Sequence, residues 1–65
     1  MVTVGDATVC WHEGLSLADI LRELGLPEGY PLAEIDGTPV WKQDWDAAAV
    51  PDGARVRFHW MIGGG

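Results

Sequence analysis

The residues best suited to chemistry stand at the end of the sequence, where Ile62 is followed by Gly63, Gly64 and Gly65. Glycine has no Cβ, so a glycine run adopts extended or left-handed dihedral angles at no steric cost. Such a run can pass through a narrow channel that excludes side chains, and it presents an unhindered α-carboxylate there. ATP can activate such a carboxylate as an acyl adenylate. We therefore expect Gly65 to react and Gly63 and Gly64 to thread it into a partner's channel.

The rest of the sequence contains no competing catalytic or metal site. Cys10 is the only cysteine, so no intramolecular disulfide can form. A lone cysteine in a strand usually acts as a small hydrophobic residue. His12 and His59 lack the spacing of metal ligands, and no phosphate-binding loop or catalytic-triad motif is present. A glycine end is also typical of a frayed terminus or an expression scar, so the argument depends on the elements before it.

Length and charge limit the classes of function. The 65 residues allow one small domain without a deep cleft, which favours a carrier, inhibitor or binding module over a self-contained enzyme. Ten acidic and four basic residues give a net charge of -6, which argues against binding nucleic acid or an anionic membrane. The charge suits a partner with a basic docking face, or serves solubility alone. With no signal peptide, membrane span or disulfide expected, we predict a cytoplasmic protein.

The N-terminal residues predict a β-hairpin. Residues 2–4 alternate as a strand does, residues 5–6 fit a two-residue turn, and residues 7–11 would form the return strand. In this register Val4 faces Ala7 and Val2 faces Val9. One face would then carry Val2, Val4, Ala7, Val9 and Trp11, and the other Thr3, Thr8 and Cys10.

A helix is predicted to follow, with Ser16 as its N-cap. An apolar stripe recurs at helical spacing and would face the core. It consists of Leu17, Ile20, Leu21 and Leu24. Asp19 suits the positive end of the helix dipole, Gly25 fits the left-handed position after the helix, and Pro27 prevents continuation.

Three further strands are predicted. Residues 32–35 and 38–41 flank Asp36-Gly37, a strong type I′ turn signal, and Pro39 places the second of these strands at a sheet edge. Trp45 would plug the core from a helical turn. Residues 55–62 form the longest alternating pattern and should be the central strand. Its core face would carry Val56, Phe58, Trp60 and Ile62, and its other face Arg55, Arg57, His59 and Met61.

The element order ββαββ, a short turn and a final strand predicts a small α+β roll with one helix across one sheet face. The second face stays open and is a natural docking surface. We expect it to carry Thr3, Cys10, Arg57, His59 and Met61. Within this set we take Arg57, His59 and Met61 as candidate partner-docking residues.

Four segments together resemble the ThiS family of ubiquitin-like sulfur carriers, to which the MoaD carriers are related. They are the hairpin leading into residues 14–21, the strand–turn–strand of residues 33–40, residues 41–45, and residues 52–56 with the last strand and terminal glycines. The resemblance covers essentially the whole chain. The sequence departs from the family at Trp41, where Pro is usual, and at Lys42, where Arg is frequent. It also leaves open what Trp11, Trp41 and Trp60 do.

The resemblance implies a β-grasp fold, with a mixed four- to five-stranded sheet packed on one helix. Residues 1–62 would form a single domain and residues 63–65 a flexible tail. The resemblance also implies that a ThiF- or MoeB-like enzyme adenylates Gly65 with ATP and Mg²⁺. A cysteine desulfurase or rhodanese would then supply sulfur for a Gly65 thiocarboxylate, which an acceptor such as a ThiG-like thiazole synthase would use. The protein would be a carrier without its own cofactor, and not an enzyme.

Other functions remain open from the sequence. A MoaD-like carrier would serve molybdopterin or another sulfur-containing metabolite. A ubiquitin-like modifier would join Gly65 to target lysines through an isopeptide bond. A plain interaction domain would have an incidental glycine end. The first two share the adenylate, so the glycine end does not separate them.

Overall fold

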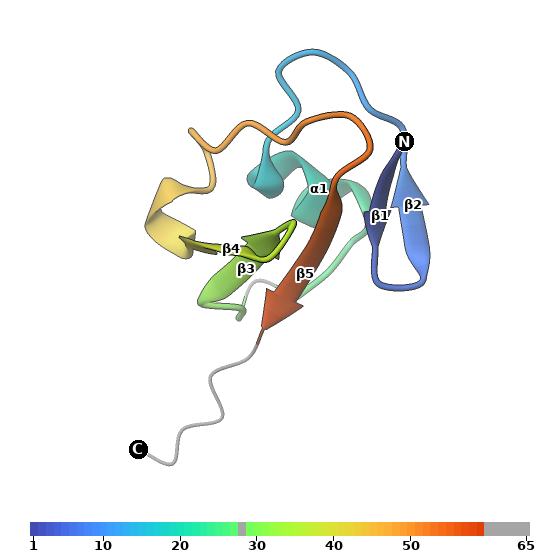
Figure 1. The fold of residues 1–65 in the computed structure, drawn as a ribbon. Helices are drawn as coiled ribbons and strands as arrows, with labels where there is room; N and C mark the ends of the chain where they lie inside the picture. Colours follow the sequence, from blue (N-terminus) through green and yellow to red (C-terminus); the bar gives the residue numbers. More distant parts are fainter. Residues whose placement is uncertain (28, 60–65) are drawn as a thin grey trace.

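Five strands form one mixed sheet, and a single helix lies across one of its faces (Figure 1). The computed structural model describes residues 1–27 and 29–59. Predictions for Trp60, Met61 and Ile62, and for the glycines 63–65, lie outside the described residues. The elements are β1 (Val2–Val4), β2 (Ala7–Val9), α1 (Leu17–Glu23), β3 (Leu32–Ile35), β4 (Thr38–Trp41), the 3-10 helix η1 (Lys42–Asp44) and β5 (Arg55–His59).

The strand order is β2-β1-β5-β3-β4, which places β5 at the centre as predicted. β5 runs parallel to β1 and antiparallel to β3, while both hairpins are antiparallel. A chain that forms a hairpin, crosses by one helix and returns to the middle of the same sheet has the β-grasp topology. The predicted fold class is confirmed.

The N-terminal hairpin has the predicted register, with Val2 opposite Val9 and Val4 opposite Ala7. Gly5 has a φ of +60°, a left-handed conformation that glycine adopts without steric cost. The return strand was predicted to reach Trp11, and this is wrong because β2 ends at Val9.

Trp11 leaves the strand because its indole finds a different partner. Its Nε1 donates a hydrogen bond of 2.7 Å to the carbonyl oxygen of Val50. The side chain stays 40% exposed instead of joining the core face of the hairpin. An indole N–H needs an acceptor when it packs against protein, and this contact ties the loop after β2 to the loop before β5.

Reciprocal hydrogen bonds cap α1 at its N-terminus. The Ser16 Oγ accepts from the Asp19 backbone N–H, and the Asp19 carboxylate accepts from the Ser16 N–H, both at 3.2 Å. This is a capping box, in which two otherwise unpaired donors are satisfied. At the other end Gly25 has the predicted positive φ, and the Leu26 N–H donates to the Leu21 carbonyl. Nearby residues thus set both ends of a short helix, through side chains at the start and through the backbone at the end.

The capping box makes acid stability depend on Asp19. Hydrogen bonds from the Ser16 backbone and side chain, then the Arg22 guanidinium, hold the pKa of Asp19 below its ordinary value of 3.8. Because the folded-state pKa is the lower one, the contribution is full above the unfolded pKa and is lost as pH falls through the folded pKa.

We therefore expect Asp19→Asn to lower the free energy of unfolding at pH 7 and to lower it less below pH 3.8. Ser16→Ala should cost about 1 kcal/mol at neutral pH. Urea denaturation at several pH values measures both effects. The control is Asp46→Asn, which removes an exposed acid outside the cap. An Asp19→Asn penalty that stays constant down to pH 2 would contradict the linkage.

The second hairpin also follows its turn residues. Asp36 and Gly37 have φ values of 50° and 87°, so both central residues are left-handed, as a type I′ turn requires. The turn pairs Ile35 with Thr38. β4 is an edge strand, which confirms the expectation from Pro39.

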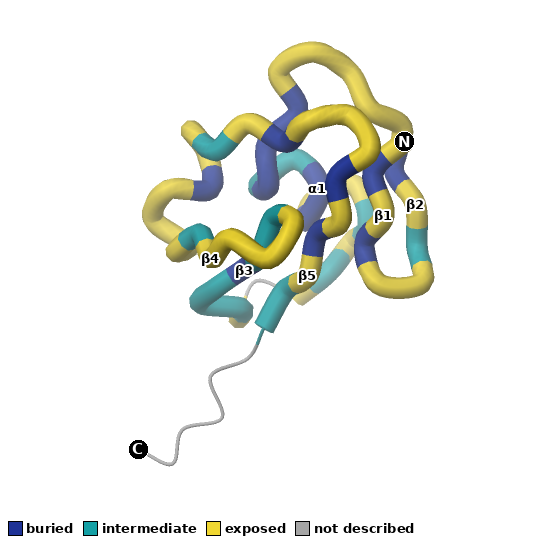
Figure 2. Tube along the Cα trace, viewed as in Figure 1, coloured by how far each residue is buried: buried dark blue, intermediate teal, exposed yellow. Residues whose placement is uncertain are grey.

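Trp45 seals the core between α1 and the sheet, as predicted. It is 3% exposed, and its ring meets Phe58 edge-on at a centroid distance of 5.2 Å. Its Nε1 donates to the Val40 carbonyl at 3.0 Å. Figure 2 shows exposed and buried positions alternating at the start of β5, and intermediate positions at its end. The largest fully buried side chains are Leu15, Leu17, Ile20, Val2 and Val56.

Candidate functional site

The sheet face opposite α1 is the candidate docking surface. Alternate residues of a strand project to opposite faces, so β5 buries Val56 and presents Arg55, Arg57 and His59 on the open face. Thr3 pairs with Arg55 and joins this face. Cys10 is exposed but lies beyond the end of β2. The candidate Met61 lies outside the residues that the structure describes.

Apolar side chains on β3 and β4 extend the open face. Directly paired residues of neighbouring strands project to the same side. Leu32 pairs with both His59 and Trp41, and Pro39 pairs with Glu34, which itself pairs with Arg57. Trp41 is 51% exposed. We call Leu32, Pro39 and Trp41 the apolar patch of the open face.

The sequence reasoning considered Trp41 as part of an apolar contact surface, but it missed Leu32 and Pro39. A signal for them was available, because the Asp36-Gly37 turn fixes the pairing of β3 with β4. Which side of the sheet these side chains occupy also depends on how β3 pairs with β5. In that pairing Leu32 lies opposite His59. That pairing joins distant parts of the chain and cannot be read from the turn.

His59 makes a specific contact across the open face. Its Nε2 lies 2.6 Å from the Oε1 of Glu34, and the two side chains are 40% and 31% exposed. The residues are diagonal neighbours, since Glu34 pairs directly with Arg57. The contact holds the imidazole against β3.

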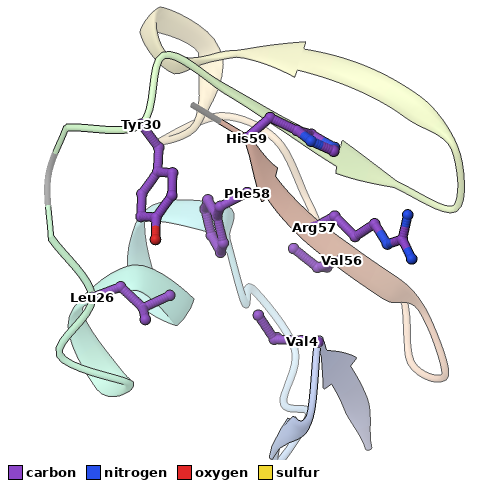
Figure 3. Close-up of a pocket in the computed structure, with 8 residues that line it drawn as sticks. Val4, Leu26, Tyr30, Val56, Arg57, Phe58 and His59 are labelled. Atoms are coloured by element: carbon purple, nitrogen blue, oxygen red, sulfur yellow. The ribbon is translucent and has the colours of Figure 1, made fainter. Parts of the chain in front are cut away.

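A cavity of about 340 Å³ opens beside the last residues of β5 (Figure 3). It lies where β1 ends at Val4 while β5 continues to His59. The rings of Tyr30 and Phe58 lie 5.6 Å apart at its wall. The lining residues are Val4, Gly5, Leu26, Tyr30, Val56, Arg57, Phe58 and His59. Mostly aliphatic and aromatic walls suit an apolar group of a partner better than acid–base chemistry.

Within residues 1–27 and 29–59, no group of three or more His, Cys, Asp or Glu side chains is arranged to hold a metal ion. No helix in this same part of the chain is long and apolar enough to span a membrane.

The central strand carries the chain toward the glycine residues. β3 flanks β5 along Val56 to His59, and β1 flanks its first half. Residues 60–65 follow directly, and covalent geometry limits their extension to about 20 Å beyond His59. They start from the end of the sheet where His59, Leu32 and Trp41 form one row.

Comparison with solved structures identifies the class of protein. The chain is similar to the crystal structure of a thiamine biosynthesis protein (ThiS) from Geobacter metallireducens, with 31% identity and a TM-score of 0.77 over 98% of this chain and 97% of that one. It is also similar to an NMR solution structure of a thiamine biosynthesis protein from this organism, with 31% identity and a TM-score of 0.67 over 98% and 86% of the two chains. Neither a protein-family model nor a curated protein matches the sequence.

The topology and the near-complete superposition define a small β-grasp protein of ubiquitin-like type. Within that class, the chain belongs to the ThiS family. The predicted resemblance is confirmed.

Proposed function

We propose that the protein is a sulfur carrier of thiamine biosynthesis, whose Gly65 is adenylated and then converted into a thiocarboxylate. The observation that carries the proposal is the full-length match to ThiS structures, in a chain whose sequence places Gly63, Gly64 and Gly65 shortly after the central strand. In this proposal the protein is a cytoplasmic co-substrate and not an enzyme.

The chemistry divides between the carrier and its partner. A carboxylate is a poor electrophile until one of its oxygens becomes part of a leaving group. Adenylation by a ThiF- or MoeB-like enzyme supplies AMP as that leaving group, and the enzyme provides ATP, Mg²⁺ and oriented charges. The persulfide of a sulfur donor, such as a cysteine desulfurase or rhodanese, then displaces AMP and leaves an acyl disulfide. A thiol reductant cleaves the S–S bond to give the Gly65 thiocarboxylate, whose sulfur is passed on. A ThiG-like thiazole synthase would receive it.

The carrier needs only reach, an exposed carboxylate and a docking face. We propose that the open face binds the adenylating enzyme through Arg57, His59 and Met61, together with Leu32 and Trp41 of the apolar patch. The half-exposed Trp41 supports this choice, because Trp and Arg are enriched among the residues that dominate binding energy at protein interfaces.

The variant Gly64→Ala tests the threading step. A Cβ at this position would clash with a channel shaped for glycine, and a misplacement of about 1 Å can slow a reaction about 100-fold. We expect a loss of this order in ATP–pyrophosphate exchange catalysed by the ThiF-type enzyme of the same organism. The thermal unfolding midpoint should not change. Exchange at the wild-type rate would refute the steric role of Gly64.

A further inference from the structure

Two arginines lie close together on the open face of a chain whose overall charge is -6. Arg55 and Arg57 are alternate residues of β5, so both project from the open face, with Cα atoms about 7 Å apart. Both are exposed, and in Figure 3 the Arg57 side chain points away from the Phe58 ring. The chain has only four Lys and Arg residues, so half of its permanent cations lie on neighbouring sites of one strand.

The carboxylates nearest to these arginines are engaged by other groups. Glu34 lies directly opposite Arg57, but its Oε1 contacts the His59 Nε2 at 2.6 Å. The Asp36 Oδ1 accepts a hydrogen bond of 2.9 Å from the backbone N–H of Arg55, not from its guanidinium. The ion pairs among residues 1–27 and 29–59 join Met1 to Asp52, Arg22 to Asp19, and His59 to Glu34.

Both guanidinium groups on β5 therefore lack an ion-pair partner among the described residues. Arg22 provides the contrast, because its Nη2 lies 2.6 Å from the Asp19 Oδ1 on α1. A guanidinium presents five N–H donors in a planar fork that matches a carboxylate in a bidentate arrangement. Two such forks at this spacing fit two carboxylates of a partner better than any basic surface.

The arginines and the apolar residues lie at different ends of the open face, so the face is not symmetric for a binding partner. Arg55 and Arg57 lie toward the start of β5, whereas His59, Leu32 and Trp41 form the row at its end. A partner with acidic groups over the arginines and an apolar group over the apolar patch can bind in one orientation only.

We propose that Arg55 and Arg57 form a paired cationic site that binds two acidic side chains, about 7 Å apart, on the adenylating enzyme. The inference rests on the proposed carrier function and specifies the partner surface for it. The overall charge of -6 predicts a basic docking face on the partner, whereas the open face itself predicts an acidic one.

The test compares the double variant Arg55→Gln/Arg57→Gln with the single variant Arg22→Gln, using the full chain and the ThiF-type enzyme of the same organism. Association rates are measured by stopped flow at several NaCl concentrations. We expect the double variant to associate about tenfold more slowly at low salt and to lose most of its salt dependence. Arg22→Gln should associate at the wild-type rate, because it removes a cation from the helix side.

The outcomes separate the two proposals. If the double variant associates as fast as the wild type, or faster, the partner surface is not acidic there and the paired site is overturned while the carrier function stands. If the wild-type chain neither binds the enzyme nor is adenylated by it, both proposals fail.

Discussion

Deletion of Gly65 should abolish formation of the terminal thiocarboxylate and leave the domain folded. The remaining terminal carboxylate would fall short by one residue, about 3.5 Å. Reacting atoms must approach to about 3–3.5 Å, so a shortfall of this size should slow activation at least 100-fold. Intact-mass measurement after incubation with the adenylating enzyme, ATP, Mg²⁺ and the sulfur donor reports the product.

A matched variant separates the effect of chain length from the effect of a side chain at the last residue. Gly65→Ala keeps the length of the chain and adds only a Cβ beside the reacting carboxylate. If length alone matters, this variant retains activity that the deletion lacks. Two results would contradict the account: a deletion variant that gains sulfur at the wild-type rate, or one that loses its helical circular-dichroism signal and so shows a structural role for the last residue.

The substitution Trp45→Ala should have the largest effect on stability. The side chain is 3% exposed, packs edge-on against Phe58 and donates to the Val40 carbonyl. Removal of a buried Trp typically costs about 3–5 kcal/mol. A domain of this length has a total stability of roughly 3–10 kcal/mol, so much of the variant should be unfolded at 37 °C. Urea denaturation followed by circular dichroism measures the loss.

Trp11→Ala is the matched control for that substitution. Both indoles donate to a backbone carbonyl, since the Trp11 Nε1 lies 2.7 Å from the Val50 oxygen. Trp11 is 40% exposed, so its removal should cost mainly a hydrogen bond, about 1 kcal/mol. An equal loss of stability in the two variants would show that core packing of Trp45 is not what holds the domain together.

Local chemistry explains why much of the fold was predictable. Gly5-Asp6 and Asp36-Gly37 each fix a two-residue turn, and a turn fixes the register of the strands on both sides. Ser16 and Gly25 set the ends of α1 through hydrogen bonds that depend on nearby residues alone. The alternation of residues 55–59 marked the central strand because β5 meets the core on one face.

The features that were missed depend on contacts between distant residues. Trp11 was assigned to a strand because the alternating pattern continued, but its indole bonds to Val50, 39 positions away. The contact of His59 with Glu34 requires the pairing of β3 with β5. The apolar patch depends on that same pairing. Periodicity within a segment carries no information about which other segment lies beside it.

The proposed site also combines features that were predictable from local sequence with features that depend on distant contacts. Gly63, Gly64 and Gly65 were assigned their role from residue type and from resemblance to the ThiS family, and this role remains a prediction. Arg57 and His59 were placed on the open face by alternation, and both lie there. What alternation could not predict is that His59 is engaged by Glu34 while the guanidinium of Arg57 has no ion-pair partner among the described residues.

The central claim concerns the last carbonyl carbon of the chain, and intact mass spectrometry tests it most directly. The chain is incubated with the ThiF-type enzyme of its own organism, ATP, Mg²⁺, a persulfide donor and a thiol reductant. The account predicts a product in which one oxygen of Gly65 is replaced by sulfur, located in the C-terminal peptide. An unchanged mass would contradict it, and so would larger conjugates formed through Gly65, which would indicate a protein modifier instead.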